Sequence, residues 1–121
     1  MQYMLLIYGD EKQRARVPES ERNAVFQQYM DFTQGIVKSG HFRAGDALEP
    51  TASATTVRVK SGQAVTTDGP FAETKEQLGG YYLIEAKNLD EAVAIAARIP
   101  AARMGGSIEV RPVMPTPKVE K

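Results

Sequence analysis

The stretch of the sequence richest in side chains that could carry out acid–base chemistry is residues 67–83, TDGPFAETKEQLGGYYL. Asp68 and Glu73 could each take a proton from a substrate if burial or a neighbouring like charge raised the carboxyl pKa. The ammonium group of Lys75 could stabilise the enolate or phenolate that results. The stretch therefore predicts a candidate catalytic loop in which Asp68 is the general base.

The same loop has a structural interpretation. An Asp followed by Gly-Pro readily accepts a hydrogen bond from a nearby backbone N–H, so Asp68 could form an Asx turn. Glu73, Lys75 and Glu76 could form a solvated cluster of weak ion pairs. Phe71 could either line a pocket or anchor the loop on the core. Both interpretations stay open.

His41 is the only histidine of the chain, and its near-neutral pKa makes it a further candidate proton carrier. It follows Gly40, where we expect a helix to end, so capping that helix is its alternative role. Asp46 lies close enough in the sequence to pair with it. Arg58 and Tyr82 flank the candidate loop and are predicted to bind ligand, with Arg58 as an anion stabiliser.

Composition argues against several classes of function. Lys+Arg and Asp+Glu each number 15 in 121 residues, so no net positive charge attracts nucleic acid. The absence of Cys disfavours a metal centre, and we expect no cofactor. Gly79-Gly80 lacks the rest of a phosphate-binding motif and is better explained by a bulge or a close packing point. No segment reaches the roughly 18–20 apolar residues of a membrane helix, so we expect a cytoplasmic protein.

Apolar periodicity places the elements that must position these residues. We expect strands at residues 3–8, 42–48, 81–84 and 108–112, a hairpin at 56–66, and helices starting near residues 18 and 89. Pro18 suits a first helical turn, Asn88 suits an N-cap, and Pro100 should end the second helix. Val25, Tyr29, Phe32 and Ile36 form a stripe on the first helix, which Phe26, Met30 and Val37 widen, so we expect one buried face.

This order, βαββαβ with an inserted hairpin, predicts a ferredoxin-like α+β fold. We expect one domain over residues 1–114 and a frayed tail over 115–121. The strands at residues 3–8 and 81–84 are apolar on both alternations. Because helices cover only one face of such a sheet, we expect a second copy to cover the other face in a homodimer.

Residues 68–82, DGPFAETKEQLGGYY, resemble the signature of the DGPF branch of YCII-related proteins. Further matches to that pattern are YMLLIY at 3–8, TTVR at 55–58, DEA at 90–92 and EVRP at 109–112. The resemblance spans nearly the whole chain. It implies the dimeric α+β barrel fold.

The resemblance implies little about activity. DGPF-type proteins are similar to many uncharacterised bacterial sequences, some encoded beside or fused to extracytoplasmic-function sigma factors. The wider superfamily includes cofactor-free isomerases, monooxygenases and a dehydrochlorinase with a suspected His/Asp acid–base pair.

Two hypotheses follow. The first is a cofactor-free isomerase, lyase or dehalogenase that acts on a small aromatic or enolisable molecule. In it Asp68 is the base, His41 or Glu73 is the proton partner, and Lys75 or Arg58 stabilises the anion. The alternative is a non-catalytic module that binds a small ligand or a partner such as a sigma factor.

Overall fold

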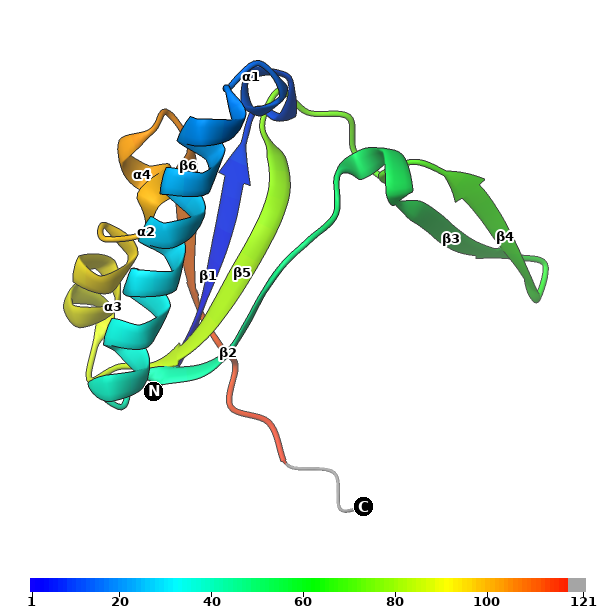
Figure 1. Cartoon of the computed structure of the whole chain (residues 1–121). Helices are drawn as coiled ribbons and strands as arrows, with labels where there is room; N and C mark the ends of the chain where they lie inside the picture. The colour runs from blue at the N-terminus through cyan, green and yellow to red at the C-terminus, as the bar shows by residue number, and fades with distance from the viewer. Residues whose placement is uncertain (118–121) are drawn as a thin grey trace.

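The computed structural model describes residues 1–117, which form a four-stranded sheet with helices on one face and a separate hairpin (Figure 1). The strands are β1 (Gln2–Gly9), β2 (Phe42–Ala47), β3 (Thr55–Lys60), β4 (Gln63–Asp68), β5 (Gln77–Glu85) and β6 (Ser107–Pro112). The helices are α1 (Glu11–Ala15), α2 (Glu19–Lys38), α3 (Leu89–Ala96) and α4 (Pro100–Arg103), and a 3₁₀ turn, η1, spans Thr51–Ser53. Of the tail predicted to fray, residues 118–121 lie outside the described residues.

The strands of the main sheet lie in the order β2-β5-β1-β6, and all neighbours are antiparallel. With α2 between β1 and β2 and α3 between β5 and β6, this is the ferredoxin-like arrangement. The predicted α+β fold is therefore confirmed. None of the helices within residues 1–117 is long and apolar enough to span a membrane.

The core lies between the main sheet and the helices. Leu5 and Ile84 from the sheet and Ile36 from α2 are completely buried, and burying each such side chain contributes about 1.5–3 kcal/mol. Phe32 packs edge-on against Tyr82 with ring centroids 5.2 Å apart. The helical layer is thus fastened to the sheet mainly through the second half of α2 and through α3.

The other face of the main sheet carries no helix. Along β1 and β5 buried residues alternate with partly buried ones, because successive side chains point to opposite faces. Met4, Leu6 and Leu83 are on this open face, where Met4 pairs with Leu83 across the two strands. Figure 1 shows the hairpin extending on the same side.

The first half of α2 departs from the predicted packing. Pro18 is the N-cap rather than the first helical residue, and Gly40 ends the region with φ 82°. Phe26 is 63% exposed and Met30 is 42% exposed, and Val37 is exposed as well, so the prediction that these residues widen the buried stripe is wrong. The physical reason at Phe26 and Met30 is a cavity between this half of the helix and the sheet.

Two further helices differ from expectation. α1 falls between the predicted first strand and first helix, where no element was expected, and Asp10 caps it by accepting from the backbone N–H groups of Lys12 and Gln13 at 2.9 and 3.4 Å. α3 begins after the predicted cap Asn88 but ends at Ala96. Pro100 opens the short helix α4 instead of directly stopping α3.

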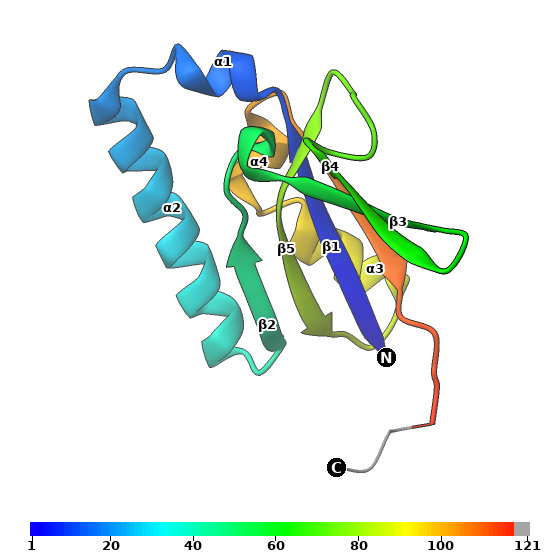
Figure 2. The same cartoon turned by 90° about the vertical axis from the view of Figure 1, so that its right-hand side faces the viewer.

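The β3–β4 hairpin projects away from the main sheet (Figure 1), so in the turned view of Figure 2 it crosses in front of β1. Ser61 and Gly62, with φ 51° and 77°, form the tight turn predicted between its strands. Val57, Val59 and Val65 are exposed on it. The hairpin therefore buries little of its own apolar surface within the chain.

Candidate functional site

A cavity of about 580 Å³ lies between the first half of α2 and the end of the main sheet nearest α1. We call this end of the sheet the open end. Its apolar lining includes Ile7, Val25, Phe26, Tyr29, Met30 and Tyr82. In Figure 2, α1 lies above this region and α2 stands beside β2. The volume is in the range of small-molecule sites in proteins.

Glycines keep the sheet side of this cavity free of bulk. Gly45, Gly79, Gly80 and Gly106 all line it. A Cβ on Gly80 would lie 3.1 Å from the Asp46 carbonyl oxygen, and one on Gly106 would lie 2.6 Å from the Tyr8 carbonyl oxygen. The register of β1 against β5 shifts opposite Gly79, which confirms the predicted bulge at the glycine pair.

Two phenol groups, those of Tyr29 and Tyr82, belong to the lining of the cavity. The Tyr82 hydroxyl lies 2.7 Å from Thr33 Oγ1, which itself donates to the Tyr29 carbonyl at 2.8 Å. Because the Thr33 hydroxyl donates its one hydrogen to the Tyr29 carbonyl, the Tyr82 hydroxyl is the donor in its contact with Thr33 Oγ1. Burial raises the pKa of Tyr82, with the Thr33 contact acting against it, and burial likewise raises the pKa of Tyr29. Both phenols are therefore neutral hydrogen-bond donors at pH 7.

Arg14 reaches the cavity from α1. A Cβ built on Gly79 would lie 3.2–3.3 Å from the Arg14 guanidinium nitrogens, so this group rests directly on the bulge of β5. α1 is fixed by Glu11, whose carboxylate accepts from the Thr51 N–H at 2.9 Å and hydroxyl at 2.6 Å. The Glu11 N–H donates to Gln77 Oε1 at 3.0 Å. These bonds hold the helix that carries Arg14 over the open end.

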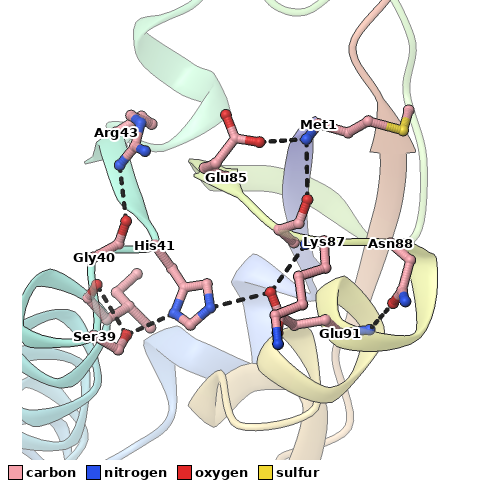
Figure 3. A network of polar contacts seen from close by, with 11 residues as sticks. Met1, Ser39, Gly40, His41, Arg43, Glu85, Lys87, Asn88 and Glu91 are labelled. Atoms are coloured by element: carbon pink, nitrogen blue, oxygen red, sulfur yellow. Dashed lines mark hydrogen bonds and ion pairs between the residues drawn. The ribbon is translucent and has the colours of Figure 1, made fainter.

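The predicted site residue His41 directly precedes β2, at the end of the sheet away from α1, which we call the closed end. Figure 3 shows its contacts there. Its Nε2 is 3.2 Å from Glu91 Oε1 and its Nδ1 is 2.6 Å from Ser39 Oγ. The alternative pairing with Asp46 is not formed, since Asp46 lines the cavity at the open end, where it accepts from the Tyr81 hydroxyl at 2.9 Å. His41 thus connects the end of α2 to the start of α3.

The polar groups of the closed end satisfy one another. The Lys87 backbone N–H donates to Glu91 at 3.0 Å and, ahead of His41, lowers the pKa of that carboxyl. Asn88 caps α3 through the Glu91 N–H. The N-terminal amino group binds Glu85, and Figure 3 shows this contact beside the His41 network. We interpret this end as structural.

The remaining predicted residues, except Tyr82, lie on the hairpin and the loop after it. Asp68 is exposed at the end of β4 and makes no side-chain hydrogen bond within residues 1–117. The turn there is organised by Gly69, with φ 99° and a 2.7 Å bond from its N–H to the Ala54 carbonyl. The Thr56 hydroxyl donates to the Gly69 carbonyl at 2.8 Å. The Asx turn considered for Asp68 is therefore replaced by other contacts.

The structure brings two of the predicted ligand-binding residues together. The Arg58 guanidinium lies 5.0 Å from the centre of the Phe71 ring, a cation–π contact on the hairpin side of the molecule. Glu73 and Lys75 are exposed on the same loop. Tyr82 alone of the seven predicted site residues lines the cavity. Within residues 1–117 no three His, Asp or Glu side chains come together in a way that could hold a metal ion.

The sequence interpretation missed Arg14 and Thr33 as cavity residues. Arg14 was overlooked because its helix has only 5 residues, although Asp10 is a recognisable N-cap ahead of it. Thr33 lies on the buried side of α2 between apolar residues, a position that could have drawn attention to it. Tyr29 was identified only as part of the apolar stripe.

Comparison with known proteins agrees with the family suggested by the sequence. Residues 1–117 match the YCII-related domain. An uncharacterized protein of Rhizobium meliloti (strain 1021), R00369, is 39% identical over 114 residues, which cover 93% of this chain and 92% of that protein. The chain therefore belongs to the YCII-related family.

Proposed function

We propose that the protein binds a small, largely apolar organic molecule in the cavity at the open end. The observation that carries the proposal is the cavity itself, about 580 Å³ between α2 and a sheet surface kept bare by glycines. Apolar walls supply affinity, and a few polar groups orient the ligand. The Tyr29 hydroxyl would supply one such group as a neutral donor, and the Tyr82 hydroxyl, whose hydrogen goes to Thr33, would supply an acceptor.

Binding is favoured over the acid–base enzyme because of where the proton carriers lie. Asp68, Glu73 and His41, the predicted catalytic residues, are not among the residues that line the cavity. A general base must come within hydrogen-bonding reach of the proton that it removes. Isomerase, lyase or dehalogenase chemistry by these residues stays a prediction.

Titration with 2-naphthylmethanol, a neutral aromatic probe, tests the binding proposal. We expect NMR chemical-shift changes centred on Tyr29, Thr33 and Tyr82. Val25→Trp should fill the cavity and weaken binding at least tenfold. Val37→Trp is the matched control, since Val37 is exposed on the same helix outside the cavity, and it should bind like the wild type.

Equal affinity in the Val25→Trp and wild-type proteins would refute this location. So would shifts confined to the hairpin. If the probe caused no change at all up to its solubility limit, the proposed function would be abandoned.

We also propose the predicted face-to-face homodimer, the dimeric form of this α+β fold. Two features support it: the helix-free face with Met4, Leu6 and Leu83, and the hairpin on the same side with Val59 71% exposed. An isolated two-stranded hairpin is marginally stable in water, so contact with a second copy would stabilise it. The polar groups Glu109 and Arg111, an ion pair on β6, would lie toward the rim.

Light scattering after size-exclusion chromatography tests the dimer. We expect twice the mass of one chain for the wild type and a monomer for Leu6→Glu, which places a charge in the middle of the open face. Val37→Glu, on the helical side, should remain dimeric. A wild-type monomer at micromolar concentration would contradict the proposal.

Three finer predictions from the sequence stay predictions. They are membership of the DGPF branch, a cytoplasmic location, and association with a sigma factor. Co-purification of the tagged protein from its native host would test the last of these. An absence of any sigma factor among the captured proteins would count against it.

A further inference from the structure

We propose that the ligand is an organic anion, a carboxylate on an apolar body, and that the Arg14 guanidinium pairs with it. This inference rests on the proposed function, because it assumes that the cavity at the open end is the binding site. It goes further in naming the chemical class of the ligand and the residue that recognises it.

The first observation is that Arg14 has no partner among the described residues. Its side chain donates no hydrogen bond and makes no salt bridge to any group in residues 1–117. Arg14 is an exposed residue, and its guanidinium lies against the sheet at Gly79, at the edge of the cavity. A guanidinium has five N–H donors in a planar fork that matches a carboxylate. Water can satisfy these donors in the free protein, and a carboxylate bound in the cavity would replace that water without displacing a protein acceptor.

The second observation is the charge balance of the cavity. Two guanidinium groups, those of Arg14 and Arg22, and two carboxylates, those of Asp10 and Asp46, belong to its lining. Both carboxylates are engaged, Asp10 by the backbone of α1 and Asp46 by the Tyr81 hydroxyl. The formal charges of the lining therefore balance, and what it leaves unmatched within residues 1–117 is the N–H donors of the two guanidinium groups, which suit an anionic acceptor.

The third observation is that Arg14 is positioned by other residues. Glu11, on the preceding turn, is bound by Thr51 and forms no salt bridge with Arg14, although after the Thr51 hydrogen bonds the Arg14 charge also lowers the pKa of its carboxyl. Arg14 lowers the pKa of Tyr29, although burial is the larger, opposing effect, which indicates that its charge is felt on the α2 wall of the cavity. An anion bound to Arg14 would therefore face the Tyr29 side of α2.

The apolar lining defines the rest of the ligand. Val25, Phe26 and Met30 present hydrocarbon and ring surface toward the same cavity. A bare inorganic anion would leave these walls in contact with water, whereas an aromatic or branched carboxylic acid would cover them. The site thus fits a molecule with one anionic group and an apolar body.

Two nearly isosteric probes, 2-naphthoate and 2-naphthamide, separate the charge from the body. We expect the wild type to bind 2-naphthoate at least tenfold more tightly than the amide by fluorescence or calorimetric titration at pH 7. Arg14→Gln should reduce naphthoate affinity about tenfold and leave amide affinity unchanged. Arg16→Gln is the matched control, because Arg16 ends the same helix but does not line the cavity.

The outcomes distinguish the two proposals. Equal binding of both probes to the wild type would overturn the anion inference while the cavity remained a binding site. Failure of both probes to bind would overturn the inference and the proposed function together. Equal losses in Arg14→Gln and Arg16→Gln would indicate general surface charge and would also overturn the inference. Circular dichroism and thermal unfolding of both variants would confirm that they fold.

Discussion

The two ends of the helix–sheet layer differ in whether their polar side chains have hydrogen-bond partners within the chain. At the closed end, His41, Glu91 and Ser39 hold one another between α2 and α3. At the open end, Arg14 lies beside an apolar cavity with its guanidinium unmatched within the described residues. The same helix, α2, passes from one environment to the other.

This difference separates a structural polar cluster from a candidate binding site. A network whose donors and acceptors satisfy one another stabilises the fold and has little capacity left for a ligand. Donors without acceptors beside apolar surface have that capacity. His41, a candidate proton carrier by residue type with helix capping as its alternative role, thus belongs to the first group, whereas Arg14 belongs to the second.

The largest expected effect compares packing along α2. Ile36→Ala removes a fully buried side chain near the closed end and should lower the free energy of unfolding by about 2–5 kcal/mol. Met30→Ala, at the cavity, should cost less than about 1 kcal/mol because the side chain is 42% exposed. Urea unfolding measures both. Similar losses would mean that the first half of α2 packs as tightly as the second.

The next effect tests how closely the backbone is packed behind the cavity. A Cβ on Gly106 would meet the Tyr8 and Ala101 carbonyl oxygens at 2.6 and 3.0 Å, so Gly106→Ala should cost about 1–3 kcal/mol. Gly9→Ala is the control, since no atom lies within 4 Å of its added Cβ. Thermal and urea unfolding should show a loss of stability for Gly106→Ala and none for Gly9→Ala. A stable Gly106→Ala protein would argue for more room there than the structure has.

A smaller effect concerns the placement of Arg14. In Gly79→Ala the new methyl group would press on the guanidinium, which can move because it ends a flexible side chain. Stability should therefore change little, while 2-naphthoate affinity should fall several-fold, less than in Arg14→Gln. The 2-naphthamide affinity serves as the internal control. Unchanged naphthoate binding would show that the resting position of Arg14 is not the one used for binding.

The smallest effect is the pH dependence of the closed end. The pKa of Glu91 is lowered from 4.5, so its carboxylate stabilises the folded state above that pH and loses this contribution as the pH falls through the lower folded-state value. Glu91→Gln should consequently shift the urea midpoint slightly at pH 7 and much less at pH 3. If the difference in urea midpoint between Glu91→Gln and the wild type grew as the pH fell, the stabilising role given to the Glu91 carboxylate would be wrong.

The fold was predictable because its signals are local. Short runs that are apolar on both alternations marked β1 and β5, Asn88 marked the start of α3, and Ser61-Gly62 marked the hairpin turn. The extent of α2 was also predictable, but not which of its apolar side chains are buried. Phe26 and Ile36 both suit a buried helical face, and only the tertiary structure separates the exposed one from the buried one.

The candidate site was much less predictable from the sequence. Acidic residues near Gly-Pro attracted attention to Asp68 and Glu73, yet both are on the exposed hairpin side. The cavity instead depends on long-range relations, such as Arg14 lying on Gly79 and Tyr82 meeting Thr33. Periodicity and residue type carry no information on such pairs.

Glu11 connects α1 to the base of the β3–β4 hairpin. Its carboxylate binds Thr51, at the point where the chain departs for the hairpin, and its N–H binds Gln77, where the chain returns. A single residue therefore joins both ends of the segment that contains the hairpin to the helix that carries Arg14. A deletion of the hairpin that also removed Thr51 and Gln77 would leave α1 without these hydrogen bonds. Loss of ligand binding in such a variant would therefore reflect the displacement of Arg14, and would not show that the hairpin itself contacts the ligand.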